Sequence, residues 1–282
     1  MCKWNLVFDV ALCTGCHNCT IAVQDEYVGN AFPGYAAEMP RRGPNWVTLE
    51  RRERGTFPMV DVAHLFKACL HCDDPSCLAA ARDGAVRKRD DGIVVIDPER
   101  ARGQTAIARA CPYGAVHWDE GRGLPQHWNF DAHLIDGGWP APRPVQACPT
   151  GALRALKVTD EEMTRLVQAE NLLPPPGARH GSRIHYRNLA RYTGEFAGGT
   201  LVAVEAATQA CVGGATVVLS RGGERVAETT SDIFGDFRFA PLPPASGHYR
   251  VDIAADRFRN HSLEFELNDS RWLGEIVLEP AE

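Results

Sequence analysis

The sequence of 282 residues lacks several features that would point to other classes of protein. No apolar run approaches the ~18 residues that a transmembrane helix requires, so we expect no direct insertion into a membrane. Met1 to Asp9 lack the apolar core and cleavage site of a secretory signal, which predicts a cytoplasmic protein unless a partner exports it. Positive charge is not in excess either. With 30 Lys and Arg against 36 Asp and Glu the net charge is −6, so nothing favours nucleic acid as a partner.

Cysteine is scarce after Gly198, where only Cys211 occurs, but it is abundant before that point. Two short loops each carry three cysteines, and each loop has a distant partner in which cysteine is followed by proline. Ferredoxin-type sites use this arrangement: the loop thiolates bind three irons of a cubane, and the remote Cys-Pro binds the fourth. The spacing therefore predicts two 4Fe-4S clusters. The first ligand set is Cys13, Cys16, Cys19 and Cys148, and the second ligand set is Cys69, Cys72, Cys77 and Cys111.

The two remaining cysteines, Cys2 and Cys211, lie outside both ligand sets, and we expect them to be ordinary thiols. A reducing cytoplasm disfavours disulfides as the use of so many cysteines. Zinc is the alternative metal, because four-thiolate zinc sites are common. Structural zinc usually pairs one CxxC with another, and neither set does so, whereas both sets have a Cys-Pro partner. His17 lies inside the first loop, and we interpret it as a solvent-side residue rather than a ligand.

A sequence motif that occurs twice predicts how the chain is organised. The phrase Cys-Pro-x-Gly-Ala-aliphatic occurs at Cys111 and again at Cys148, which indicates two duplicated ferredoxin-like subdomains. After Gly198 short alternating strands separated by Gly- and Pro-rich turns are typical of an all-β sandwich. The predicted class is α+β. We expect a ferredoxin-like domain over residues 1–156 with an insertion at 27–60, a helix and basic linker over 157–197, and a sandwich over 198–282.

Three local features predict structure within this organisation. Asp91-Gly92 between apolar runs indicates a hairpin. Thr159-Asp-Glu-Glu162 is a capping box, and the helix that it opens is expected to run to Pro174. The insertion contains Trp46 and several arginines, residue types that are favoured at interfaces, so we favour an interface there over a solvated loop.

These motifs resemble the iron–sulfur subunits of the molybdopterin oxidoreductases related to dimethyl sulfoxide reductase. Within that family the chain is similar to the small subunits of pyrogallol–phloroglucinol transhydroxylase and resorcinol hydroxylase. Gly92-Ile-Val-Val-Ile-Asp-Pro98 also carries the resemblance, and Glu50-Arg-Arg-Glu-Arg-Gly55 together with the appended sandwich narrows it to these small subunits. Ser231-Asp-Ile-Phe-Gly-Asp-Phe-Arg-Phe239 resembles the Cna-B or transthyretin-like sandwich of the same small subunits.

The resemblance implies a function and a partner. A large subunit would hold molybdopterin and move hydroxyl groups onto or between polyhydroxylated aromatic rings. This chain would transfer electrons through its two 4Fe-4S clusters and would supply no catalytic residue. Two alternatives stay open: the electron-transfer subunit of another molybdopterin oxidoreductase, such as a respiratory reductase or dehydrogenase, or a scaffold with structural clusters.

The chain departs from a four-cluster ferredoxin pattern in an ordered way. The ligand positions of two further clusters hold other residues, and among the four positions of the first of these only Asp131 has a side chain able to bind iron. Two complete sets are therefore absent and two are complete, so we do not expect a four-cluster path to a membrane quinone site. The absent positions are Val23, Trp128, Asp131 and Pro144 for one cluster, and Ala81, Ala101, Gln104 and Ile107 for the other.

Overall fold

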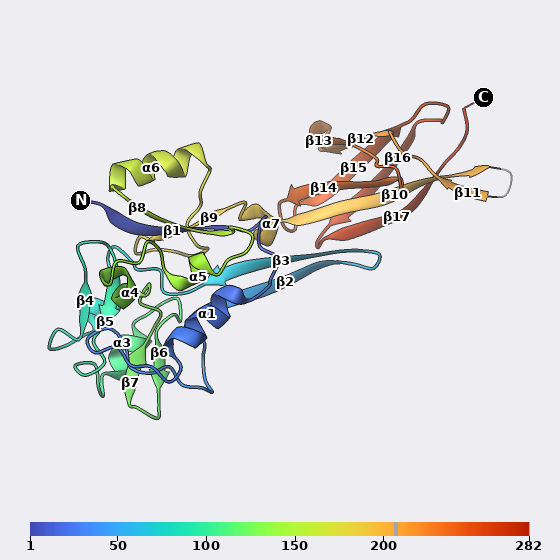
Figure 1. Cartoon of the computed structure of the whole chain (residues 1–282). Coiled ribbons are helices and arrows are strands. Elements are labelled where there is room, and N and C mark those ends of the chain that lie inside the picture. Colours follow the sequence, from blue (N-terminus) through green and yellow to red (C-terminus); the bar gives the residue numbers. More distant parts are fainter. Residues whose placement is uncertain (206–207, 282) are drawn as a thin grey trace. The chain divides into compact units, whose positions relative to one another are not determined.

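The computed structural model describes residues 1–205 and 208–281, which divide into two compact units (Figure 1). The first unit comprises Met1–Arg51 and Ala63–Leu189, and the second comprises Arg52–Val62 and Ala190–Glu282. The domain boundaries predicted at residues 156 and 197 stay predictions. Among the described residues no helix is long and apolar enough to cross a bilayer.

A three-stranded sheet organises the first unit. It consists of β1 (Lys3–Asp9), β8 (Leu153–Val158) and β9 (Ile184–Arg187), with β1 antiparallel to β8 and parallel to β9. The central strand β1 is buried along nearly its whole length, because its apolar side chains are covered on both faces. Phe8 pairs with Leu153, so the end of β1 and the start of β8 meet. This pairing joins the loop before Cys19 to the segment after Cys148.

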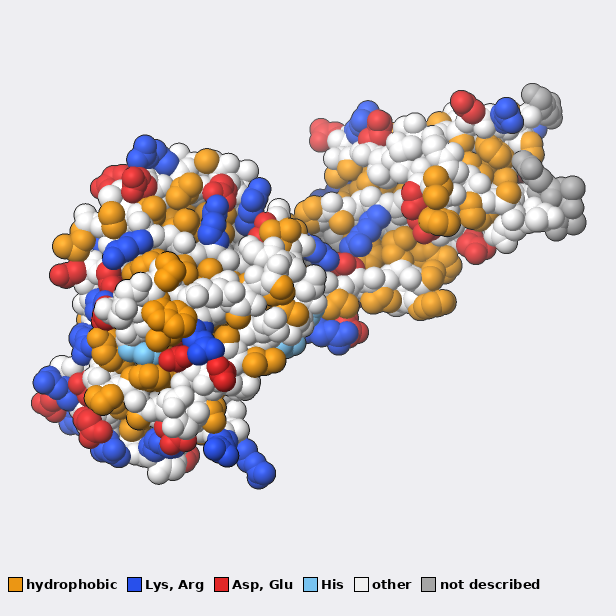
Figure 2. All heavy atoms as spheres, in the orientation of Figure 1, with side chains coloured by type: hydrophobic (Ala, Val, Ile, Leu, Met, Phe, Trp, Pro, Cys, Tyr) orange, Lys and Arg blue, Asp and Glu red, His pale blue; other side chains and the backbone are white. Residues whose placement is uncertain are grey.

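Short helices and hairpins form the rest of the first unit. The predicted hairpin around Asp91-Gly92 is confirmed, with β4 paired antiparallel to β5. Figure 2 shows Lys and Arg interspersed with Asp and Glu on the face in view. The elements are α1 (Asn18–Tyr27), α2 (Ser76–Ala79), β4 (Val86–Lys88), β5 (Val94–Ile96), α3 (Thr105–Arg109), β6 (His117–Asp119), β7 (Leu124–Gln126), α4 (Ala132–Asp136), α5 (Arg143–Gln146) and α6 (Asp160–Ala169).

Helix α6 begins as predicted but ends early. The Thr159 hydroxyl accepts from the Glu162 N–H and the Glu162 carboxylate accepts from the Thr159 N–H, which confirms the capping box. The helix stops at Ala169, before Pro174, so the expected end was wrong. Asn171 adopts a left-handed φ of 52°, which turns the chain and lets Leu172 pack beside Met163.

The insertion forms a hairpin, and two of the residues that suggested an interface are buried in it. Its strand β2 (Thr48–Thr56) pairs with β3 (Met59–Lys67) in a long hairpin. Trp46 is 2% exposed and its ring lies 4.9 Å from that of Tyr27, so it is a core residue. Arg54 is also buried and forms an ion pair with Asp61. The interface interpretation is wrong for these two residues, because packing within the chain has already covered them.

The second unit is a β-sandwich of two four-stranded sheets, preceded by α7 (Ala190–Thr193). Inward-facing residues such as Val217, Leu219, Val251 and Ile253 alternate with outward-facing ones and form its core. One sheet contains β10 (Glu195–Glu205), β11 (Thr208–Cys211), β14 (Asp236–Leu242) and β17 (Arg271–Leu278). The other contains β12 (Thr216–Arg221), β13 (Glu224–Thr230), β15 (Gly247–Ala254) and β16 (His261–Leu267).

Candidate metal centres

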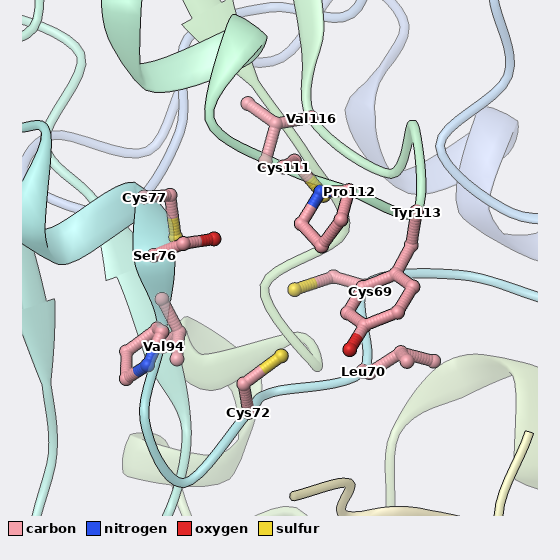
Figure 3. A pocket seen from close by; sticks show the side chains of 11 residues that line it. Cys69, Leu70, Cys72, Ser76, Cys77, Val94, Cys111, Pro112, Tyr113 and Val116 are labelled. Carbon is pink, nitrogen blue, oxygen red and sulfur yellow. The ribbon is translucent and has the colours of Figure 1, made fainter. Parts of the chain in front are cut away.

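The second ligand set lines a single pocket. Figure 3 shows that the four sulfur atoms point into the same space, which Tyr113 and Pro112 border on one side. Leu70, Val94 and Val116 add apolar walls. The structure therefore brings together the four thiols that the spacing grouped, namely Cys69, Cys72, Cys77 and Cys111.

Local structure explains why these cysteines meet. Cys69 and Cys72 lie in the loop that follows β3, and Cys77 lies in the single turn of α2. Cys111 comes two residues after the end of α3. The Ser76 hydroxyl donates to the Ala110 carbonyl at 2.8 Å, which ties α2 to the residue before Cys111. One hydrogen bond thus joins the two segments that supply the later ligands.

The electrostatics of this pocket favour a bound cation. Burial, with the neighbouring thiols of Cys77 and Cys111, raises the pKa of Cys72 to about 11. Burial and Cys111 raise the pKa of Cys77 to about 11, and burial raises the pKa of Cys69 well above its usual value. Four thiolates in one apolar pocket repel one another, so the ionised set needs the positive charge of a metal. Four convergent sulfur donors fit a 4Fe-4S cluster.

The first ligand set also converges, but it lies nearer the surface. Cys19 is buried at the start of α1, Cys13 and Cys148 are half-buried, and Cys16 is exposed. Burial raises the pKa of Cys19 to about 12, and the nearby thiols of Cys13, Cys148 and Cys16 add to the rise. The β1–β8 pairing thus delivers the remote cysteine to the loop.

Two residues between these cysteines have left-handed backbones. Gly15 has a φ of +72°, and a Cβ at this position would lie 2.4 Å from the imidazole of His64. Only glycine fits there without displacing that ring. His17 has a φ of 62° and is exposed, so it sits on the solvent side as predicted.

The positions of one absent cluster are occupied by a buried polar network. Val23, Trp128, Asp131 and Pro144 are all buried. Asp131 accepts hydrogen bonds from the Trp128 indole at 2.9 Å, the Tyr27 hydroxyl at 2.9 Å and the Arg143 backbone N–H at 2.8 Å. Burial raises the pKa of this carboxyl. Both of its oxygens are engaged, so Asp131 acts here as a hydrogen-bond acceptor within the protein core.

The positions of the other absent cluster are filled mainly by apolar packing. Ala101 and Ile107 are fully buried beside Cys77, and Ala81 packs against the same core. The side-chain amide of Gln104 accepts a hydrogen bond from the Arg82 N–H at 2.8 Å and donates one to the Arg100 carbonyl at 2.7 Å. The side chains at both sets of positions are thus engaged in packing or hydrogen bonds within the chain.

Two buried histidines and one half-buried lysine beside the second ligand set were missed from the sequence. His71 accepts from the Val94 N–H at 3.1 Å, and the His127 ring nitrogen lies 3.0 Å from the Val94 carbonyl. Ligand atoms of Cys69, His71 and His127 lie within 4.8 Å of one another. Cys69 already belongs to the second set, and both rings bond to β5, so we assign the two histidines a supporting role. The third residue is Lys88, on β4. The only feature of the sequence that singled it out was its place on the strand before the Asp91-Gly92 turn.

Comparison with known proteins assigns the chain to a family. It is 39% identical to the pyrogallol hydroxytransferase small subunit of Pelobacter acidigallici, over 90% of this chain and 91% of that protein. This chain belongs to that small-subunit family. One subunit of the anaerobic dimethyl sulfoxide reductase of Escherichia coli is 29% identical over 54% of this chain and 72% of its own length. The family is therefore that of the iron–sulfur subunits related to dimethyl sulfoxide reductase.

Two family models match separate parts of this small subunit. A 4Fe-4S dicluster domain matches residues 60–158, a range that contains the second ligand set and Cys148. A carboxypeptidase regulatory-like domain matches residues 201–274, within the sandwich. The 5-hydroxyisourate hydrolase of Klebsiella pneumoniae is 22% identical over 31% of this chain and 93% of that chain, with a TM-score of 0.26. The matched models support an iron–sulfur part followed by a β-rich part.

Proposed function

We propose that this chain is the iron–sulfur electron-transfer subunit of a molybdopterin-dependent hydroxylase or transhydroxylase that acts on polyhydroxylated aromatics. The iron–sulfur role rests on the convergence of four thiols in one pocket. The aromatic substrate class is supported by 39% identity to a pyrogallol hydroxytransferase small subunit. A large partner subunit would hold the molybdopterin and carry out the catalysis.

Each ligand set would hold one 4Fe-4S cluster, and each cluster supplies a centre that accepts or releases one electron. The protein's part is to supply the sulfur donors, restrict water and fix the loops. The second set does this with apolar walls and the Ser76–Ala110 hydrogen bond. We assign the first cluster to Cys13, Cys16, Cys19 and Cys148, and the second to Cys69, Cys72, Cys77 and Cys111.

Three finer assignments accompany this proposal. The repeated Cys-Pro-x-Gly-Ala phrase supports a duplicated ferredoxin-like arrangement. Two packed antiparallel-rich sheets support a sandwich of Cna-B or transthyretin-like type. The cytoplasmic location also stays a prediction, which cell fractionation with an antibody against this chain would test.

The first experiment measures iron and acid-labile sulfide on the anaerobically purified protein, with the partner's iron subtracted. Two clusters predict about eight iron atoms per chain and two one-electron signals in an EPR-monitored titration. About twelve iron atoms would contradict the two-cluster count. Zinc in place of iron would overturn the electron-transfer role, and clusters that stay redox-inert would favour the scaffold.

A matched pair of variants tests the ligand assignment. Cys148→Ser should lower the iron content by about four atoms, because it removes a ligand of the first cluster. Cys211→Ser should leave the iron content unchanged, since Cys211 is exposed on β11 of the sandwich. Equal iron in both variants would contradict the first ligand set.

The substrate class is tested on the native complex, isolated through a tag on this chain. We expect a molybdopterin-containing large subunit to copurify and the complex to convert pyrogallol or resorcinol. Turnover of dimethyl sulfoxide or formate with neither phenol converted would instead support another member of the superfamily.

A further inference from the structure

Lys88, on β4, places its ammonium group against the loop that joins Cys69 to Cys72. Its Nζ donates to the carbonyl oxygens of His71 at 2.7 Å, Cys72 at 2.6 Å and Gly92 at 2.8 Å. An ammonium has three N–H donors, and three acceptors use them all. The side chain is 19% exposed. The geometry therefore requires the protonated form and fixes a positive charge beneath the loop.

The hydrogen bonds from Lys88 act on peptide groups of the loop that supplies Cys69 and Cys72. In a planar trans peptide the C=O and the next N–H point in opposite directions. The carbonyls of His71 and Cys72 both face Lys88, so the N–H groups of the same two peptides, those of Cys72 and Asp73, point to the opposite side. Lys88 thus polarises and orients two peptide groups of the loop that carries Cys69 and Cys72.

The charge of Lys88 is only partly compensated. Its nearest carboxylate, Asp73, lies 3.7 Å away, is 48% exposed and is bound more closely by Arg183 at 2.5 Å. Burial lowers the pKa of Lys88, and the charges of Asp73, Cys72 and Cys69 oppose that shift. Lys88 thus places a positive charge directly beside the second ligand set.

We propose that Lys88 raises the reduction potential of the cluster held by the second ligand set and leaves that of the first cluster unchanged. Reduction adds one electron to the cluster and breaks no bond, so a fixed cation nearby stabilises the reduced form. Net charge and hydrogen bonding near the sulfurs are established determinants of such potentials. Lys88 is thus a positioning residue for electron transfer. This inference rests on the proposed function.

The test is an EPR-monitored redox titration of the complex with Lys88→Met, Lys88→Arg and the charge control Lys157→Met. Lys157 is exposed on β8, where its Nζ lies 5.5 Å from the Trp4 ring. In Lys88→Met the ratio of reduced to oxidised second cluster at a fixed potential should fall about tenfold, a shift of about 59 mV for one electron. Lys88→Arg and Lys157→Met should titrate like the unmodified protein, and the first cluster should not shift in any variant.

The result that overturns the proposal is a Lys88→Met protein with full iron content in which the second cluster titrates unchanged or both clusters shift together. If Lys88→Met loses a cluster, the potential of the second cluster is measured in Lys88→Gln instead, because its neutral amide can still donate to the loop. Should neither retain its iron, Asp73→Asn is measured. Removing the carboxylate beside Lys88 should raise the potential of the second cluster alone, and an unchanged potential refutes the proposal. Failure of the proposed function would appear differently, as missing iron or missing redox signals in the unmodified complex.

Discussion

Replacing Asp131 by alanine removes the acceptor at the centre of the network that occupies one absent cluster position. The Trp128 indole N–H and the Arg143 backbone N–H would then be buried without a partner. Each such donor costs about 1–3 kcal/mol. Tyr27 keeps an acceptor, because its hydroxyl also donates to Asn129 at 2.6 Å. Part of the loss is offset, since burial raises the pKa of Asp131 and so opposes its charged form. We therefore expect a net loss of about 2–3 kcal/mol.

Asp131→Asn is the matched control for this prediction. Its amide oxygen can still accept from Trp128 and Tyr27, and only the bond from the Arg143 N–H at 2.8 Å is lost. The expected loss is about 1 kcal/mol. Urea unfolding of the cluster-loaded chain under anaerobic conditions, followed by tryptophan fluorescence and cluster absorbance, ranks the variants.

Iron content decides between a structural and a ligand role for Asp131. Both variants should retain about eight iron atoms per chain, because the carboxylate already has three protein donors. A fall of about four atoms from a starting value near twelve would show that Asp131 binds a third cluster. Unchanged stability in Asp131→Ala would equally refute the reasoning from buried donors.

Two further predictions concern backbone and charge. Gly15→Ala should lose the first cluster and lower the iron content from about eight to about four atoms, because the new Cβ would lie 2.4 Å from His64. The control is Gly151→Ala, where φ is +67° and the space around the new Cβ is open. This variant should lose only about 1 kcal/mol of stability and keep its iron. Asp61→Asn should destabilise the second unit by about 3 kcal/mol in thermal unfolding, because it leaves the buried Arg54 cation without its carboxylate. Burial alone would raise the pKa of Asp61, but Arg238 and Arg54 lower it below 3.8. The contribution of Asp61 to the free energy of unfolding is therefore complete above pH 3.8 and is lost as the pH falls through the lowered pKa. Asp61→Asn should therefore lose less stability below pH 3.8 than the unmodified chain. The same loss of stability with falling pH in both proteins would contradict this role of Asp61.

Features that depend on neighbours in the chain were predictable. The thiol groupings follow from short spacings and a following proline, and the structure brings together the same cysteines. The capping box at Thr159 and the hairpin at Asp91-Gly92 are local in the same sense, because each is set by hydrogen bonds within a few residues. The end of α6 was not predictable, since the chain turns after Ala169 and Leu172 packs against Met163 of α6 and Val7 of β1.

The sequence by itself determined which side chains can bind iron and which cluster ligands are absent, because those properties belong to residue identity and spacing. Only the tertiary structure decided which polar groups are buried and what they contact. Tyr27 and Asp131 meet across 104 residues, and Lys88 reaches the loop of Cys72 from a separate strand. Such contacts depend on the packing of distant segments, which no local pattern encodes. The same reason placed Trp46 and Arg54 in the interior, although their residue types favoured an interface.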